Sequence, residues 1–549
     1  MIDNKNQELI SLVKKRYKYL LCGVFFAICY ASIIVALPLV SKYLIDVVLS
    51  TNDINKVYSG ILLFFAVSAL QPTFFCIKEL FFTRLLEKFA YDLRIVLFKK
   101  LNSLPMITYD RINYGEVSTR IVTDTKELCN YIYYISNQLL TNCLLIILIL
   151  VFMFLQNSLI SGIILVFFIS YYIINSAVSR RFRKLYKNSL ENNEKMHNLI
   201  KQWYDKSLLT KLFNDQLDIN KEVHSIFANV KSNTVRENNL RNLLNGITLG
   251  IMTVALAVIY GIGAILIIKG AISLGTVLAL GLFFQSLIPA LNSFIMSNVQ
   301  YNKVKPSLNR IKEYLLEPVE SGNIELKGDI SIKFNNVSFG YEIDKTVLRN
   351  INFQIKEPGI YGFVGPSGSG KSTISKLILG LYSVTNGKIE ITGENINELE
   401  KNSLRSHISY LPQDITLIND TILNNIQLGN KNVQIDKLNY FCELLDIRNI
   451  ISNLPLGYQT VITDKVNLSG GEKRRIAICR TCVKSADLYI FDEADASLQK
   501  ELYRDLTKIY SELGKEKIVI VITHQDETLK DAKQTFYLNE YGQIARSCQ

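Results

Sequence analysis

Charged residues are missing from long stretches of the first 300 residues. Residues 19–41, 57–77, 242–268 and 270–302 contain no Asp, Glu, Lys or Arg, and the longest gap covers residues 128–179. A helix needs about 20 apolar residues to cross the hydrocarbon core of a bilayer, so each gap is long enough for a span. Buried helices of a soluble domain are the alternative. The number and the purity of these runs argue against it.

Six membrane spans are predicted from these gaps, because the longest gap holds two spans with a turn near residues 156–158. The predicted spans lie near residues 18–41, 57–79, 133–155, 159–178, 245–268 and 273–296. Since the spans carry essentially no ionisable residues, a proton or metal-ion relay inside the membrane is not expected.

Lys and Arg are distributed unevenly around the predicted spans. They collect before the first span, between the second and third, and after the fourth, whereas only Lys269 separates the fifth from the sixth. Cytoplasmic loops carry the excess of Lys and Arg, so both termini are predicted to be cytoplasmic. The net charge of +12 is largely this topology signal, and no nucleic-acid partner is expected.

The nine cysteines form neither a zinc-ligand pattern nor a disulfide framework. Cys479 and Cys482 have the spacing of a metal or redox pair, but they fall in a predicted helix, where a structural role is the stronger interpretation. An odd number of cysteines without a framework fits a reducing compartment.

Two cytoplasmic connections are unusually long, at residues 80–132 and 180–240. Both have apolar residues at three- and four-residue spacing with charges between them, which predicts helices. The membrane helices are therefore expected to continue into the cytoplasm, with a short crossing helix at each turn, near residues 114–121 and 199–207. Each crossing helix could contact a soluble domain.

The spans contain polar but uncharged residues that permit two interpretations. Such side chains can line an uncharged cavity for cargo or make hydrogen bonds between helices, and the sequence leaves both open. The residues concerned are Asn137, Gln138, Asn142, Asn175, Gln285 and Asn292, together with many tyrosines.

The composition changes after about residue 305, where strands begin to alternate with helices, as in a parallel α/β sheet. We predict a transmembrane domain over residues 1–305, a linker over 306–327 and a nucleotide-binding domain over 328–549. A complete Walker A motif follows an apolar strand and opens a helix. It consists of Gly365, Pro366, Ser367, Gly368, Ser369, Gly370, Lys371, Ser372 and Thr373.

The Walker A motif predicts ATP binding. Its glycines let the backbone curl so that the N–H groups face the phosphates, whose charge the helix N-terminus also favours. Lys371 is expected to reach the β- and γ-phosphates, and the Ser372 hydroxyl to ligate Mg²⁺.

A second apolar strand, at residues 488–491, ends in Asp492 and Glu493. Two acids after a strand usually form a solvated turn, but a Walker A loop in the same chain favours a Walker B motif. Asp492 is then expected to hold the metal through its water shell, and Glu493 to orient an attacking water.

The sequence LSGGE at residues 468–472 carries a family resemblance. It is very similar to the signature of ATP-binding-cassette transporters, and LPLGYQT at 454–460 also matches their exporter pattern. Nearly the whole chain resembles the half-sized exporters of that family. The resemblance implies an all-α six-helix transmembrane domain followed by an α/β P-loop NTPase cassette domain, and an ATPase coupled to transport.

Further positions match the family's motifs in order. Tyr341 matches the aromatic residue that stacks on adenine, and Gln413 the glutamine that contacts Mg²⁺ and the membrane-domain helices. His524, one of only four histidines, ends an apolar strand and matches the switch histidine near the γ-phosphate.

The resemblance also explains a second phosphate-binding stretch in one chain. The family's signature closes over nucleotide held by the Walker A motif of another subunit, which implies a second copy or a related chain as partner. A homodimer is the first expectation and a heterodimer the alternative. The residues expected to cap the γ-phosphate in this way are Ser469, Gly470, Gly471 and Glu472.

Two positions depart from the family pattern. Glu472 stands where glutamine is commoner, a change that related cassettes tolerate. The segment ADASLQ at 494–499 replaces the usual TSALD, with Gln499 in place of an aspartate that helps the two sites communicate. Hydrolysis is still expected, because Glu493 and His524 are both present.

The resulting functional hypothesis is a bacterial plasma-membrane exporter of peptide-like or amphipathic compounds that works by alternating access. Its expected partners are the lipid bilayer, the second subunit and the cargo. Two alternatives remain open at this stage. One is a lipid or multidrug translocase, and the other is an importer or an ATP-gated regulator on the same fold.

Overall fold

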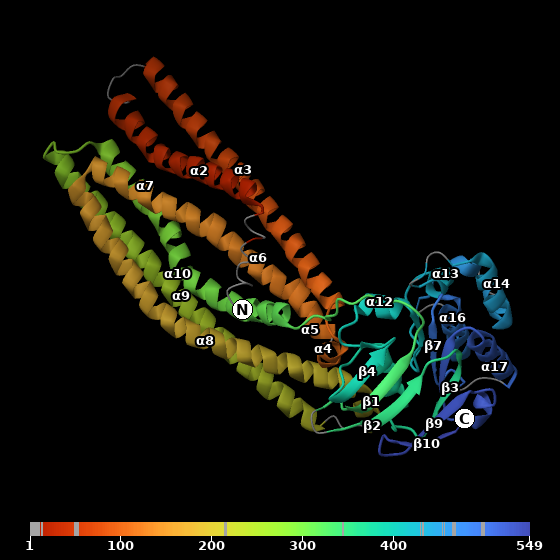
Figure 1. The fold of residues 1–549 in the computed structure, drawn as a ribbon. Coiled ribbons are helices and arrows are strands. Elements are labelled where there is room, and N and C mark those ends of the chain that lie inside the picture. The colour runs from red at the N-terminus through yellow and green to blue at the C-terminus, as the bar shows by residue number, and fades with distance from the viewer. Residues whose placement is uncertain are drawn as a thin grey trace. The chain divides into compact units, whose positions relative to one another are not determined.

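The computed structural model describes residues 11, 15–48, 54–112, 114–213, 217–342, 345–428, 430, 433–452, 454, 456–463, 468–495 and 500–548, with some side chains between 175 and 222 also left aside. The chain forms two compact units (Figure 1). The first contains Met1–Lys100 and Tyr114–Leu316, and the second contains Leu101–Asn113 and Glu317–Gln549.

The first unit is built of long helices. Its α-helices are α2 (Tyr17–Tyr43), α3 (Ile54–Asn102), α5 (Tyr114–Ser118), α6 (Thr125–Tyr133), α7 (Leu140–Gln156), α8 (Ser158–Phe213), α9 (Leu217–Ile268) and α10 (Leu274–Leu316). Three π-helical segments join them, η1 (Leu44–Val48), η3 (Thr119–Asp124) and η4 (Tyr134–Leu139), so that α5 to α7 read as one helical run.

Five described helical runs are long and apolar enough to cross a membrane. They are Tyr17–Val48, Ile54–Asn102, Gly115–Gln156, Val223–Ile268 and Leu274–Leu316, and the apolar start of α8, Ser158–Ile174, adds a shorter one. The predicted fourth span, residues 159–178, begins on this start of α8 and ends among side chains outside the described set.

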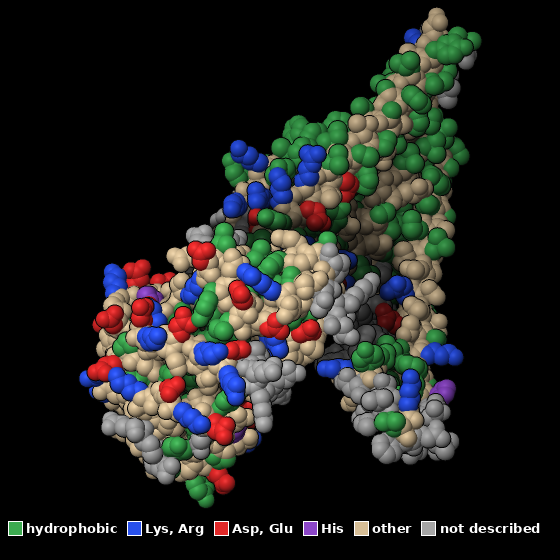
Figure 2. All heavy atoms as spheres, turned by 90° about the vertical axis from the view of Figure 1, so that its right-hand side faces the viewer, with side chains coloured by type: hydrophobic (Ala, Val, Ile, Leu, Met, Phe, Trp, Pro, Cys, Tyr) green, Lys and Arg blue, Asp and Glu red, His purple; other side chains and the backbone are tan. Residues whose placement is uncertain are grey.

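Large apolar side chains cover the outside of these helices. Leu62, Phe65 and Ile268 are each more than 70% exposed, and Figure 2 shows hydrophobic side chains over much of the helical unit. In water this exposure would be unfavourable, whereas lipid is as apolar as the side chains themselves. The helices also satisfy their own backbone hydrogen bonds, as a bilayer requires.

Both predicted crossing helices are wrong in position. The short helix that belongs with the second unit is α4 (Met106–Arg111), which follows Pro105, whereas residues 114–121 begin the long run α5–α7. Residues 199–207 lie inside the uninterrupted helix α8. The helix-breaking Pro105 is the sequence signal that marks the first of these turns.

The prediction that the spans carry essentially no charged residues is wrong at the end of the second span. Lys78 and Glu79 end the predicted second span, and both turn toward other helices, where Asn137 donates to Glu79 at 2.9 Å and 3.0 Å. Asn292 accepts a hydrogen bond from Tyr171, whereas Gln138 lines a cavity. The polar residues of the spans thus serve both of the roles left open, with the side chain of Asn175 outside the described set.

The second unit contains two sheets. One has the order β2-β1-β4-β5, and the other has the order β10-β9-β3-β8-β7-β6, with β9, β3, β8, β7 and β6 parallel. The strands are β1 (Ile332–Phe339), β2 (Leu348–Ile355), β3 (Gly359–Val364), β4 (Asn386–Ile391), β5 (Glu394–Asn395), β6 (Ile408–Leu411), β7 (Leu488–Asp492), β8 (Ile518–Thr523), β9 (Gln534–Leu538) and β10 (Ile544–Cys548).

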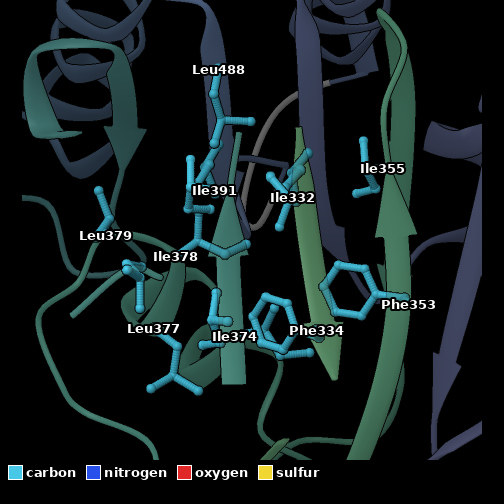
Figure 3. Packing of buried hydrophobic residues seen from close by; sticks show 14 of the residues in the cluster. Ile332, Phe334, Phe353, Ile355, Ile374, Leu377, Ile378, Leu379, Ile391 and Leu488 are labelled. Atoms are coloured by element: carbon cyan, nitrogen blue, oxygen red, sulfur yellow. The ribbon is translucent and has the colours of Figure 1, made fainter. Parts of the chain in front are cut away.

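Helices cover these sheets. Every residue of β7 and β8 is buried, as expected for parallel strands packed on both faces. Phe334 of β1 stacks on Phe353 of β2 with ring centroids 4.4 Å apart, and Figure 3 shows them beside the α11 residues Ile374 and Leu377. The helices of this unit are α4, α11 (Lys371–Ile378), α12 (Lys401–Ser406), α13 (Ile422–Ile426), α14 (Ile435–Leu444), α15 (Ile447–Ser452), α16 (Gly470–Val483) and α17 (Lys500–Gly514).

The predicted linker at 306–327 is helical over its first half, because α10 continues to Leu316. Ile311 and Tyr314 in this stretch are fully buried, so packing extends the helix beyond the point where the composition changes. Residues 317–331 then separate α10 from β1.

An ion pair between a buried carboxylate and a half-exposed arginine joins η3 to the cytoplasmic end of α10. Asp124 is 0% exposed, and Arg310 donates to it through Nε at 2.8 Å and through Nη2 at 2.5 Å. We predict that Arg310→Ala destabilises the protein by about 1–3 kcal/mol, because it leaves the Asp124 carboxylate without its partner, although water can reach the space left by the 44% exposed arginine. Thermal unfolding of the purified protein measures this as a lower Tm.

The pair between Lys303 and Glu127 supplies the matched control. It joins the same helices at 3.1 Å, but both side chains are partly exposed, so Lys303→Ala should cost only about 0–1 kcal/mol. The double variant Asp124→Leu with Arg310→Met should recover most of the lost Tm. Equal effects of the two alanine variants would contradict the prediction.

Candidate functional site

Four parallel strands end at one edge of the large sheet, and the predicted site residues follow directly. β3 leads into the Walker A loop at Gly365, β6 is followed by Gln413, β7 ends in Asp492, and β8 is followed by His524. The carboxyl ends of parallel strands are where ligands bind in open α/β sheets. Sheet topology thus brings together residues that lie up to 160 positions apart in the chain.

The Walker A loop curls in the way that phosphate binding requires. Gly368 has φ 81° and Gly370 has φ 94°, in the left-handed region that favours glycine. A Cβ at Gly370 would lie 2.6 Å from a methyl carbon of Leu348. Ser369 is 1% exposed, and its hydroxyl has no hydrogen-bond partner among the described residues. The loop therefore contains a buried polar atom that a bound phosphate could satisfy.

Lys371 folds back over this loop. Its ammonium donates to the carbonyl oxygens of Gly365 and Pro366, at 2.8 Å each. Burial lowers the pKa of Lys371, while the nearby Glu493 and Asp492 oppose that shift. The two carbonyl bonds keep the cation in place over the loop, from where it can exchange them for phosphate oxygens.

Asp492 is buried at the tip of β7 and accepts two hydrogen bonds. Ser372 donates to it at 2.9 Å and Tyr410 at 3.2 Å. Burial raises the pKa of Asp492, although both hydrogen bonds work in the opposite direction. Tyr410 was missed from the sequence. It lies in β6 opposite Ile490 of β7, three residues before Gln413, and no local pattern marks its contact with Asp492.

Glu493 is held in a strained conformation by its neighbours. Its φ is 49°, which is uncommon for a residue with a side chain, and its N–H donates to Ile522 of β8 at 2.9 Å. Gln413 donates to one carboxylate oxygen at 2.8 Å, and His524 Nε2 lies 3.0 Å from the other. Three residues predicted separately from the sequence thus meet in one network. Strain of this kind clusters at functional sites.

Tyr341 lies beside the Walker A helix, where its hydroxyl is 3.2 Å from that of Thr373. Its ring meets the Tyr382 ring edge-on at 5.2 Å. Tyr382 in turn donates a hydrogen bond to Asp110 of α4. The sequence analysis missed Tyr382 and Asp110, because nothing in either local pattern marks the pair. They connect the predicted adenine-stacking residue to the short helix α4.

The LSGGE segment forms the N-terminus of α16. Ser469 caps the helix by accepting the N–H of Glu472 at 3.2 Å, and the Glu472 carboxylate accepts the N–H of Ser469 at 2.7 Å. This capping box explains why a carboxylate is tolerated at 472. A Cβ added at Gly470 or Gly471 would touch nothing within 4 Å, so the space in front of the helix is open.

The signature and the Walker A loop are placed in different parts of the second unit. Helix α16 packs in one hydrophobic cluster with α13 to α15, and α11 packs in the other with β1, β2 and β4. No hydrogen bond joins residues 468–472 to residues 365–373 among those described for the chain. The signature and the Walker A loop of one chain therefore belong to separate packing clusters, without a hydrogen bond between them among the described residues.

The segment that departs from the family pattern is only partly described. Residues 496–499, including Gln499, lie outside the described residues. At its start, Asp495 is buried and accepts hydrogen bonds from Thr523 and, at 3.0 Å, from Thr528. The carboxylate at 495 thus anchors this segment to the end of β8.

Comparisons with known proteins agree with the two units. Residues 20–291 match the family described as ABC transporter transmembrane region, and residues 348–496 match the family described as ABC transporter. A solved structure of a bacterial Atm1-family ABC exporter with ATP bound superimposes with a TM-score of 0.83 at 22% identity, over 97% of this chain and 95% of that one.

Two relatives are similar to this chain over different shares of its length. A multidrug resistance ABC transporter ATP-binding and permease protein of Lactococcus lactis is 26% identical over 551 residues, covering 98% of this chain and 92% of that protein. The alpha-hemolysin translocation ATP-binding protein HlyB of Escherichia coli is 34% identical over 290 residues, or 52% of this chain and 41% of that protein.

The raised pKa of Asp492 predicts how stability depends on pH. The folded protein holds the Asp492 proton more tightly than the unfolded chain, so the stability contribution is present at low pH and is lost as the pH rises through the raised pKa. Without nucleotide and with a chelator present, Asp492→Asn should therefore raise the Tm at neutral pH. The gain should disappear at a pH below the ordinary range for aspartate.

Asp487 provides a control of opposite sign. Partial burial opposes the shift, but hydrogen bonds from His407 and Lys517 lower the pKa of Asp487. Asp487→Asn should therefore lower the Tm at neutral pH and have little effect in acid. If Asp492→Asn lowered the Tm at neutral pH as well, burial would not be the dominant influence on Asp492.

Proposed function

The chain belongs to the ATP-binding-cassette transporters, as a membrane exporter that carries its ATPase domain on the same chain, and from this premise we propose that it moves short peptide-like compounds out of the cytoplasm. It does so as one half of a dimer, by alternating access. The observation that carries the ATPase part of the proposal is the network in which Gln413 and His524 hold Glu493 beside the Walker A loop.

Multidrug translocation is the second candidate. It is supported by the similarity to the Lactococcus lactis multidrug protein over nearly the full length of both chains. The match to a toxin translocation protein is closer in identity, but it covers 41% of that protein. We place short peptide-like cargo first because the polar cavity of the membrane domain fits that chemistry. Neither lipid translocation nor import has such an observation behind it.

Glu493 is the residue proposed to orient the attacking water. Its carboxylate is held by Gln413 and His524, and its remaining lone pairs can accept a hydrogen bond from water. His524 would respond to the γ-phosphate and pass that change to Glu493 through their 3.0 Å contact. Lys371 would neutralise the charge that builds up on the transferred phosphoryl group.

The donor set at the strand tips fits Mg²⁺. Ser372 and Asp492 already share a hydrogen bond, and Gln413 lies one contact away through Glu493, so hard oxygen ligands converge beside the loop. The described residues contain no cluster of three or more His, Cys, Asp or Glu that would suit a softer metal. When bound, Mg²⁺ would shield the phosphate oxygens from the attacking water.

The placement of the signature supports the proposed second subunit. Ser469 and the N–H groups of Gly470 and Gly471 form an open anion site at a helix N-terminus, away from their own Walker A loop. In a two-fold dimer each signature would close over nucleotide held by the other chain, giving two equal composite sites. ATP would then hold the two cassettes together, and hydrolysis would release them.

Helix α4 is proposed to receive this motion within the second unit. Asp110 of α4 accepts from Tyr382, whose ring touches Tyr341 beside the nucleotide site. Movement of the cassette would therefore carry α4 with it, and α4 is continuous in sequence with α3 and α5 of the membrane domain. A rigid-body shift of these helices is a common way to alternate access across a membrane.

We expect Glu493→Gln to bind ATP but to hydrolyse it at least about a hundredfold more slowly, because general-base assistance is typically worth 10²–10⁴-fold. The rate is measured as phosphate release by purified protein. Inside-out vesicles should accumulate a labelled peptide with ATP when they carry the wild type, and should fail to do so with Glu493→Gln. Normal phosphate release by the variant would remove Glu493 from its proposed role.

Composite sites predict complementation between two inactive variants. Lys371→Ala and Ser469→Arg should each abolish hydrolysis as homodimers. A heterodimer of the two, isolated through different tags, keeps one intact Walker A motif opposite one intact signature and should regain part of the activity. The control is a heterodimer of Lys371→Ala with Lys371→Ala carrying both tags, which should stay inactive. Sites built within one chain would give no such recovery.

A further inference from the structure

The first unit contains a cavity between α2, α3, α7 and α10. Its volume is roughly 570 Å³, the size that typically holds a drug-sized ligand. Polar and aromatic side chains line it, at the cytoplasmic end of the predicted second span. Those used below are Tyr30, Gln71, Phe75, Lys78, Gln138, Thr141 and Asn142.

Lys78 is the cation in the wall of this cavity. The residue is 4% exposed, and its ammonium lies 3.1 Å from Glu79 and over the rings of Tyr30 and Phe75, at 5.1 Å and 5.3 Å. Two aromatic faces and one carboxylate hold the ammonium in place. An ammonium has three donors, and among the described residues one carboxylate oxygen accepts from it.

Glu79, in contrast, is saturated. Asn137 donates to both of its oxygens, Tyr133 donates to one, and Lys78 pairs with the other. The carboxylate thus has little capacity left for a cationic cargo. Lys78 retains hydrogen-bond donors for an acceptor in the cavity, so the pair favours an anionic group of the cargo over a cationic one.

Thr141 gives an independent indication of a polar occupant. The residue is 3% exposed and lines the cavity, and its hydroxyl has no hydrogen-bond partner among the described residues. Buried polar groups are normally paired, so an unpaired one in a cavity wall points to a partner that is not part of the chain. The amides of Gln138 and Asn142 lie in the same wall.

A second hollow of about 300 Å³ shares Tyr133 and Gln138 with this cavity, and it contains the ion pair of Lys303 with Glu127. Both hollows therefore combine tyrosines and amides with one Lys and one Glu. The carboxylate of each hollow is paired with a lysine and so is not free for a lipophilic cation, and neither hollow has the excess of cations that suits an acidic lipid. Matched charges and many amides instead suit a compound that is itself rich in amides.

We infer that this cavity binds a short peptide with a free carboxylate, whose carboxylate accepts from Lys78 and whose amides bond to Thr141, Gln138 and Asn142. The inference rests on the proposed export of peptide-like compounds and names the residues that would select them. The size of the cavity limits the cargo to a few residues.

The test compares two probes on the transporter reconstituted in liposomes. One is the N-acetylated tripeptide alanyl-phenylalanyl-alanine with a free carboxylate, and the other is its C-terminal carboxamide. The readout is the peptide concentration that gives half-maximal stimulation of ATPase activity. In the wild type the acid should act at a concentration about tenfold lower than the amide, because hydrogen bonds to charged groups are the stronger ones.

Substitutions at the Lys78–Glu79 pair should change the ratio of the two half-maximal concentrations, amide over acid, in opposite directions. Lys78→Gln should abolish the preference for the acid, and Lys78→Arg should keep it. Glu79→Gln leaves the Lys78 charge uncompensated and should widen the preference, which a variant that merely folds poorly cannot do. Thr141→Val should weaken both peptides by about fivefold without changing their ratio.

Lys88→Gln is the matched control, because Lys88 lies on the same helix but donates to Tyr19 outside the cavity. Its ratio should equal that of the wild type. If both peptides stimulate the wild type and the ratio is the same in every variant, the inference is overturned while peptide export stands. If neither peptide stimulates a wild type with basal ATPase activity, the proposed cargo class fails as well.

Discussion

The parallel pairing of β3, β8 and β7 is the constraint on which the rest of the site depends. These strands are buried among helices, and their register brings Val364, Thr523 and Asp492 to the same edge of the sheet. A shift of one residue would turn every side chain to the opposite face, so the apolar core fixes the position of the polar residues that follow each strand. The chemistry of the site is thus positioned by packing that takes no part in it.

Several unfavourable features are concentrated at that edge. Glu493 adopts a left-handed backbone conformation, Asp492 is buried with a raised pKa, and the Ser369 hydroxyl is unpaired. Each of these features is unfavourable on its own, and a hard cation would stabilise the buried carboxylate while a phosphate would pair with the hydroxyl. Two extensive hydrophobic clusters form the core whose stability offsets these costs. The site is therefore preorganised for its ligands, which reduces the rearrangement needed when ATP binds.

Local sequence patterns were sufficient for part of this arrangement. The Walker A loop lies between a strand and a helix, and the two acids follow an apolar strand. Both patterns are made by residues adjacent in the chain, so their place in the fold could be predicted. Tyr410, Tyr382 and Asp110 could not, because their partners lie 82 and 272 positions away and no local pattern marks them. The short helix Met106–Arg111 was predicted too far along the chain, although Pro105 just before it marks the break between helices.

Ion pairs between helices stabilise the membrane domain. Arg16 pairs with Asp92, Asp124 with Arg310 and Glu127 with Lys303, and in each case the two partners come from different helices. Such pairs hold helices together outside the predicted spans, where at least one partner of each pair keeps contact with water. Lys78 and Glu79 differ in that they are neighbours on one helix, so their attraction joins no two helices. Glu79 makes its cross-helix contacts through Asn137 and Tyr133, and Lys78 makes one through the ring of Tyr30 on α2, in the wall of the cavity. A cation that is held by aromatic faces and one carboxylate in a cavity wall is suited to recognise a group that enters the cavity and leaves it again.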